Sequence, residues 1–156
     1  MATTTDREKL IADLNGDLSR EYQAIIAYVI YSQTIKGAAY MAIAKELEGH
    51  AKEELSHAIT ISKQIDYLGG TPNATPRPVR QSDKAEDMLR FDLDNETETI
   101  RNYRQRVVQC EALGEFAMAE EIRKILAQEQ EHQIDLATAL GIDVPVVTAT
   151  PRETAH

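Results

Sequence analysis

The sequence predicts an all-α fold: a four-helix bundle made of two antiparallel hairpins joined by one long crossover. Three observations predict it. The 156 residues include only 7 Gly, 5 Pro and no Trp, and good helix formers dominate the rest. Apolar residues recur at steps of three and four along four long segments, as on the buried face of a helix. Short breaks join the first segment to the second and the third to the fourth, which is typical of antiparallel neighbours.

The first helix is expected to begin at Thr5 or Asp6, because Thr5 and Glu8 have the spacing of a capping box. Gly37 is the predicted break before the second helix, which should stop at the Gly pair that opens the segment 69–82. That segment also contains three prolines and cannot be helical. Fully extended, it can span the length of the bundle, which would make the second and third helices parallel.

The third helix is expected to follow a second capping box formed by Asp83 and Glu86, and to end at Gly114. The fourth helix should end at Gly141, and the prolines beyond it indicate an extended tail. The predicted organisation is an N-terminal tail over 1–5, the bundle over 6–140 and a C-terminal tail over 141–156.

Composition and charge limit the function. The net charge is −9, and an acidic surface repels phosphate backbones, so no nucleic-acid partner is expected. The single cysteine, Cys110, excludes an internal disulfide and a cysteine-rich metal cluster. The N-terminus lacks a basic region followed by an apolar run, and no apolar stretch is long enough for a membrane span. We therefore expect a cytoplasmic protein with no membrane partner.

Each of the four apolar series has one gap, and a glutamate fills every gap: Glu21, Glu54, Glu96 and Glu129. Counted from the predicted breaks, the four lie at similar depth, so they should meet near the middle of the bundle. Four buried anions at one level are very costly unless protons or cations neutralise them. Other glutamates lie off the apolar series and are interpreted as surface charge: Glu53, Glu98 and Glu131.

Two Glu-x-x-His motifs indicate that cations, rather than protons, neutralise the four glutamates. In Glu54–His57 and Glu129–His132 the two side chains share one helix face and can bind one ion together. A single such motif more often marks a solvated face, but two on the apolar series, with two further glutamates at the same depth, indicate a two-metal site. Four carboxylates balance two divalent cations. The predicted ligands are Glu21, Glu54, His57, Glu96, Glu129 and His132.

Several segments together resemble the ferritin-like superfamily, and most closely the bacterioferritins, from about Leu10 to Leu140. The residues that carry the resemblance are Leu18–Glu21 with Tyr28, Ala44–Leu47, Glu53–Ala58, Leu68–Pro72, Met88–Glu96, Cys110–Glu111 and Ile122–His132. The resemblance implies that members oxidise Fe(II) with O₂ or H₂O₂, as ferroxidases, and store the ferric mineral in a hollow shell.

The same resemblance implies a ligand set for two iron ions. It makes Glu54 and Glu129 bridging ligands, Glu21 and His57 terminal ligands of one iron, and Glu96 and His132 terminal ligands of the other. It also places Tyr28 beside the centre, either as an electron donor or as a tyrosine that only fills the core. His50, one turn before Glu54, is either an entry or auxiliary iron ligand or an ordinary polar helix position.

Two departures from the bacterioferritins concern haem and shell size. Haem-binding members have a Met directly after the second-helix glutamate, whereas this chain has Leu55, so no haem is predicted. The segment after Gly141 offers no short fifth helix, which the 24-subunit shells carry. A homo-oligomeric shell of 12 or 24 subunits is expected, and the missing helix favours 12.

Other functions stay open. A non-storing di-metal oxidase or peroxidase of the rubrerythrin type is one, although the Cys-x-x-Cys module common there is absent. A DNA-protecting shell of the starved-cell type is another, but the N-terminal tail has no lysine before Lys9. A metal-free structural bundle is the third. The sequence leaves the choice among iron, manganese and zinc open.

Overall fold

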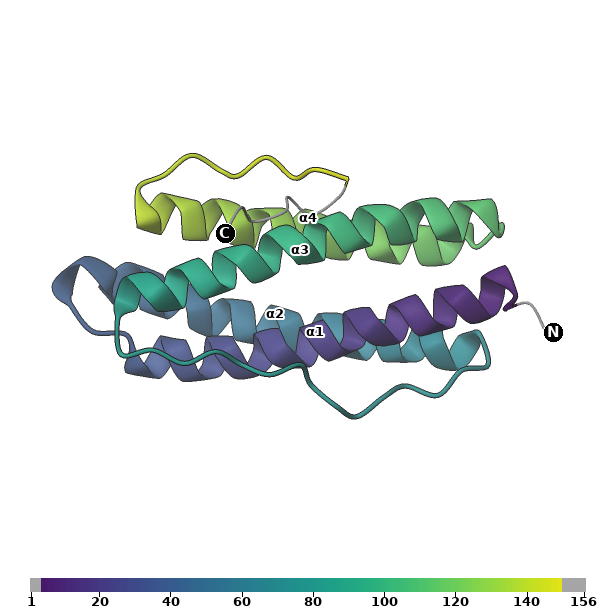
Figure 1. Ribbon diagram of the computed structural model, residues 1–156, viewed down its shortest axis with the longest axis horizontal. Coiled ribbons are helices and arrows are strands. Elements are labelled where there is room, and N and C mark those ends of the chain that lie inside the picture. Colours follow the sequence, from purple (N-terminus) through teal and green to yellow (C-terminus); the bar gives the residue numbers. More distant parts are fainter. Residues whose placement is uncertain (1–3, 150–156) are drawn as a thin grey trace, which may run out of the picture.

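The computed structural model describes residues 4–149, and every regular element within that range is a helix (Figure 1). The predicted all-α four-helix bundle is confirmed. None of the described helices is long and apolar enough to cross a membrane. The elements in order are α1 (Asp6–Thr34), the short 3₁₀ turn η1 (Ala38–Tyr40), α2 (Met41–Tyr67), α3 (Ala85–Ala112) and α4 (Phe116–Leu140).

The four helices form two antiparallel hairpins, α1 with α2 and α3 with α4 (Figure 1). In the first hairpin the start of α1 meets the end of α2, where Arg7 Nε donates to the carbonyl of Leu68 at 3.1 Å. At the other end Gln33 Nε2 donates to Glu48 Oε1 at 2.8 Å. The helices therefore pack along their whole length, as the short connection between them predicts.

The crossover, residues 68–84, runs beside α1 in the same direction (Figure 1). Asn15 Nδ2 donates to the carbonyl of Thr71 at 3.0 Å, and Gln23 Nε2 donates to the carbonyl of Pro78 at 2.8 Å. The contacts advance together along both segments, so the chain returns to the end of the bundle where α2 began. This makes α3 parallel to α2, as expected from the length of the crossover.

Local sequence signals place several helix ends correctly. Thr5 Oγ1 accepts the Glu8 N–H at 3.1 Å and Glu8 Oε2 accepts the Thr5 N–H at 2.8 Å, so the predicted capping box at the start of α1 is present. At the end of α4, Gly141 has φ 68°, a left-handed conformation that glycine adopts without a steric penalty.

The second predicted capping box, from Asp83 to Glu86, is wrong. Helix α3 begins at Ala85 with Lys84 at the N-cap, and no side chain caps it. Ser82 Oγ instead accepts the Lys84 N–H at 3.0 Å and donates to Asp87 at 2.7 Å. Because Ser82 already holds the approach to the helix, the chain enters α3 later than the capping-box spacing requires.

Two apolar clusters fill the core, with a polar layer between them. One cluster includes Leu14 and Ile61, and the other includes Leu47 and Leu89. Along every helix the buried glutamate lies where one cluster gives way to the other. The apolar clusters thus close the bundle above and below the glutamates and keep them from water.

Beyond α4 the chain turns back and follows α3 and α4 (Figure 1). Arg101 Nε donates to the carbonyl of Thr148 at 2.7 Å, and Gln133 Nε2 lies 3.5 Å from the carbonyl of Pro145. Residues 142–149 contain no helix, in keeping with the predicted extended tail. The rest of that predicted tail lies outside the described residues.

Candidate metal centre

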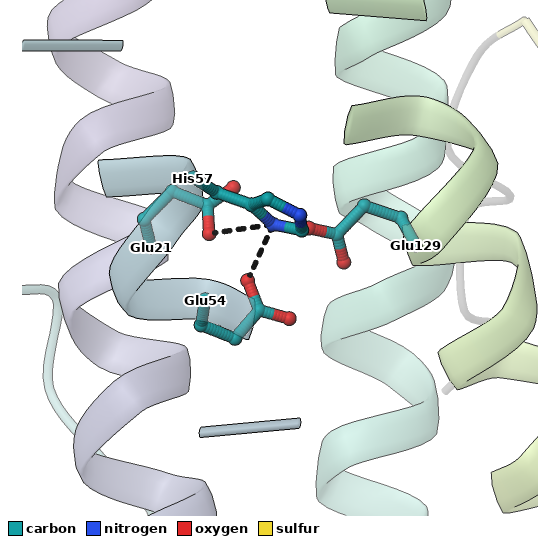
Figure 2. Close-up of side chains that lie close together, drawn as sticks. All are labelled: Glu21, Glu54, His57 and Glu129. Carbon is teal, nitrogen blue, oxygen red and sulfur yellow. Dashed lines mark hydrogen bonds and ion pairs between the residues drawn. The ribbon is translucent and has the colours of Figure 1, made fainter. Parts of the chain in front are cut away.

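The four glutamates predicted from the apolar series meet in the polar layer, one from each helix. All four are buried, with at most 2% of each residue exposed. Figure 2 shows Glu21, Glu54 and Glu129 converging on the ring of His57. His57 Nδ1 lies 3.6 Å from Glu21 Oε2, 3.2 Å from Glu54 Oε2 and 2.8 Å from Glu129 Oε1.

A second group is built in the same way around His132. Its Nδ1 lies 2.8 Å from Glu54 Oε1, 3.6 Å from Glu96 Oε1 and 3.6 Å from Glu129 Oε2. Within each group the ligand atoms all lie within 4.8 Å of one another. Glu54 and Glu129 belong to both groups, so the arrangement offers two adjoining positions for cations.

The donor atoms of the centre are poorly satisfied by the protein itself. Neither oxygen of Glu129 has a hydrogen-bond partner, although His57 Nδ1 is 2.8 Å from one of them. Glu21 Oε2, Glu54 Oε1, Glu96 Oε2 and His132 Nδ1 also lack partners. Buried polar atoms are normally paired. Carboxylate oxygens and imidazole nitrogens suit first-row transition ions, so the unpaired atoms fit two such ions.

The electrostatics point the same way. Burial raises the pKa of Glu54 well above its usual value, and the neighbouring Glu129, Glu21 and Glu96 raise it further. Burial also raises the pKa of Glu96 to about 7. For His57, burial favours the neutral form, but contacts with the carboxylates outweigh it and raise the pKa. The protein alone must therefore hold protons in this layer, and cations would displace them.

The outward nitrogens of the two imidazoles have partners that orient the rings. His57 Nε2 hydrogen-bonds to Gln128 Oε1, and His132 Nε2 lies 2.8 Å from Glu53 Oε2. Such contacts fix which ring nitrogen faces a metal. The interpretation of Glu53 as surface charge was therefore incomplete. Nothing in the helix spacing indicates either contact, because both cross from α2 to α4.

Two tyrosines hold the glutamates that belong to one group only. Tyr28 on α1 donates its hydroxyl hydrogen to Glu96 Oε1 on α3 at 2.6 Å, so it lies beside the centre as the resemblance implied. Tyr103 on α3 donates to Glu21 on α1. Tyr103 was not among the site residues predicted from the sequence. The two contacts are equivalent, because each joins the tyrosine of one hairpin to the glutamate on the first helix of the other.

A sequence signal for Tyr103 does exist, since the two hairpins carry the same pattern at a constant offset of 75 positions. The same offset relates identical core residues, such as Leu14 and Leu89 or Leu18 and Leu93. The pairs are Asp17 and Asp92, Glu21 and Glu96, Tyr28 and Tyr103, Glu54 and Glu129, and His57 and His132.

His50 is buried, although its sequence position left a solvated role open. Its ring stacks on that of His132 with centroids 4.0 Å apart and meets Tyr28 edge-on at 5.0 Å. Its Nε2 lies 3.0 Å from Asp135 Oδ2. Leu55, by contrast, is half exposed on the outer face of α2, and the absence of haem stays a prediction.

The family model of the ferritin-like domain matches residues 11–143 of the chain. Among curated relatives, the bacterioferritin of Brucella melitensis biotype 1 is 27% identical over 140 residues, covering 85% of this chain and 87% of the relative. The bacterial ferritin of Synechocystis sp. is 27% identical over 135 residues, covering 85% and 86%.

Solved structures give the same picture. A ferritin-like, diiron-carboxylate protein from Bacillus anthracis is 31% identical with a TM-score of 0.84, covering 88% of this chain and 99% of that one. The bacterioferritin-related protein of Bacteroides fragilis, a dodecameric thioferritin, is 26% identical with a TM-score of 0.81, covering 88% of both chains.

Proposed function

Because this chain belongs to the ferritin-like family, we propose that it is a ferroxidase that oxidises Fe(II) inside the bundle and stores the ferric mineral in an oligomeric shell. The resemblance to bacterioferritins expected from the sequence is confirmed. One observation carries the proposal: two buried, unsatisfied ligand groups share Glu54 and Glu129. A bundle that needed no metal would have no reason to keep so many unpaired buried oxygens.

In this proposal Glu54 and Glu129 bridge the two iron ions. Glu21 and His57 complete the ligands of one ion, and Glu96 and His132 complete those of the other, a division supported by the distances around each imidazole. The four carboxylates balance the charge of two divalent ions. The two tyrosine hydroxyls and the partners of the outward imidazole nitrogens keep the ligands in place.

Fe(II) is then the substrate as well as the cargo. Two Fe(II) ions each lose one electron, and O₂ with two protons becomes H₂O₂, or H₂O₂ with two protons becomes two water molecules. Holding the ions as a pair lets both electrons reach one oxidant molecule. The chain's own part is to fix the ligands and exclude bulk water, which the two apolar clusters do.

The test is rapid Fe(II) oxidation by the Glu54→Ala variant. The fast phase should disappear, because the variant removes a ligand shared by both ions. Glu131→Gln, an exposed position on α4, serves as the matched control and should oxidise iron like the wild type. Oxidation by Glu54→Ala at the wild-type rate would refute the proposal. Fast oxidation by a dimer that forms no mineral would instead favour the rubrerythrin-type alternative.

A further inference from the structure

A third group of metal-ligating side chains lies where α2 meets α4, separate from the six residues of the centre. Glu46 and His50 come from α2 and Asp135 comes from α4, and one ligand atom of each lies within 4.8 Å of the other two. We propose that these three residues form a third site, which binds one divalent first-row transition ion.

The helices present the three side chains to the same point. Glu46 and His50 are four residues apart, so they lie on one face of α2. Asp135 is three residues after His132, on the face of α4 that packs against α2. The group is therefore built by two rigid helices rather than by a loop, which is how precise sites are supported.

His50 supplies a buried imidazole to the group. Its side chain is only 3% exposed, and a buried imidazole nitrogen beside two carboxylates is a good ligand for a transition ion. Its Nε2 is aimed at Asp135 Oδ2, 3.0 Å away. The contact has the length of a hydrogen bond, and two adjacent ligands of an octahedral ion, each about 2.1 Å from it, are also about 3.0 Å apart, so a cation can replace the shared hydrogen with little movement of either side chain.

The ligand chemistry selects the class of ion. One imidazole and two carboxylates suit Fe²⁺, Mn²⁺ or Zn²⁺, whereas Ca²⁺ and Mg²⁺ prefer oxygen ligands alone. The two carboxylates match the charge of one divalent ion. Three protein ligands leave coordination positions for water, and solvent reaches them because Glu46 is exposed and Asp135 is half-buried.

The third site adjoins the buried pair without sharing a ligand with it. The stacked rings of His50 and His132, 4.0 Å between centroids, separate the two sites. A more exposed position next to a buried one suits an ion that waits to enter or leave. A role in passing iron to or from the centre rests on the proposed function, whereas the binding of an ion at the third site does not.

The experiment counts zinc ions per chain by equilibrium dialysis and elemental analysis, and locates them in crystals by anomalous scattering. Zn²⁺ is used because it does not change oxidation state. The wild-type protein should bind three ions per chain. The Glu46→Gln/Asp135→Asn variant should bind two, with the peak near His50 lost and the two central peaks kept.

Two further variants keep the result interpretable. Asp66→Asn/Glu131→Gln removes the same charge from exposed positions of α2 and α4 and should still bind three ions. His50→Phe keeps an aromatic ring on His132 but removes the nitrogen, and should bind two. Two ions in the wild type, or three in Glu46→Gln/Asp135→Asn, would overturn the inference. Glu54→Ala should keep the peak near His50 even if the proposed ferroxidase activity proves wrong.

Discussion

At the scale of the residue, the chemistry of this chain depends on polar groups placed where apolar ones belong. The sequence predicted that the four glutamates would come together because a glutamate in an apolar series is costly and therefore informative, and the Glu-x-x-His spacing added the two histidines. The groups that support them could not be found in that way. Gln128 and Glu53 make their contacts between helices, and helix spacing within one segment carries no information about such contacts.

The two tyrosines allow a matched test of whether Tyr28 supplies an electron. Tyr28 and Tyr103 make equivalent hydrogen bonds to Glu96 and Glu21, so a purely structural role predicts similar effects of Tyr28→Phe and Tyr103→Phe. An electron-donating role predicts a transient tyrosyl radical during Fe(II) oxidation that Tyr28→Phe alone abolishes. Electron paramagnetic resonance of rapidly frozen samples measures it. A radical that survives in Tyr28→Phe would remove Tyr28 from the mechanism.

At the scale of the element, the glycine breaks and the Thr5 N-cap were predicted correctly, because each depends only on neighbouring residues. The predicted Asp83 N-cap was wrong. Ser82 and Asp87 form a hydrogen bond at the start of α3, where the capping box was expected. The four-residue spacing from Asp83 to Glu86 does not show that Ser82 can replace Asp83 in this way. The pairing of α1 with α3 was equally hidden from the sequence. One of the contacts between these helices is a buried ion pair, in which Arg106 Nε lies 2.7 Å from Asp17 Oδ2.

That ion pair predicts a pH-dependent loss of stability. Burial raises the pKa of Asp17 to about 6, even though Arg106 lowers it. In Arg106→Met the carboxyl group loses its partner and its pKa rises further. Above that pKa the variant buries an unpaired charge and should lose about 3–5 kcal/mol of unfolding free energy. At pH 5 Asp17 is protonated, and the loss should be clearly smaller than at pH 8.

Urea unfolding of wild type and Arg106→Met at pH 5 and pH 8 measures the difference. Because each comparison is made at one pH, the titration of other groups largely cancels. The double variant Asp17→Leu/Arg106→Met removes the carboxyl group, and its difference from wild type should vary less with pH. Equal losses for Arg106→Met at both pH values would show that Asp17 does not carry the penalty.

At the scale of the whole molecule, the centre lies where two similar hairpins meet. The constant offset of 75 positions puts equivalent glutamates and histidines on opposite sides of the polar layer, which gives two candidate metal-binding groups rather than one. The length of the crossover was enough to predict this topology. Subunit assembly is a different matter, because it depends on surfaces that pack only against other copies of the chain.

For assembly we predict a shell of twelve subunits. The described part of the tail lies along α3 and α4 instead of forming a fifth helix. Native mass spectrometry of the purified protein counts the chains directly. Twenty-four chains would show that this tail does not limit the shell, and a stable dimer would remove the storage role.

The most direct test of the two-metal centre is diffraction at the iron absorption edge from crystals loaded with Fe(II) without oxygen. We expect two anomalous peaks in the polar layer of each chain, with Glu54 and Glu129 contacting both ions and one histidine contacting each. A further peak near His50 would belong to the third site and would leave this result unchanged. No iron in the polar layer, or one ion bound by only one of the two histidines, would contradict the account.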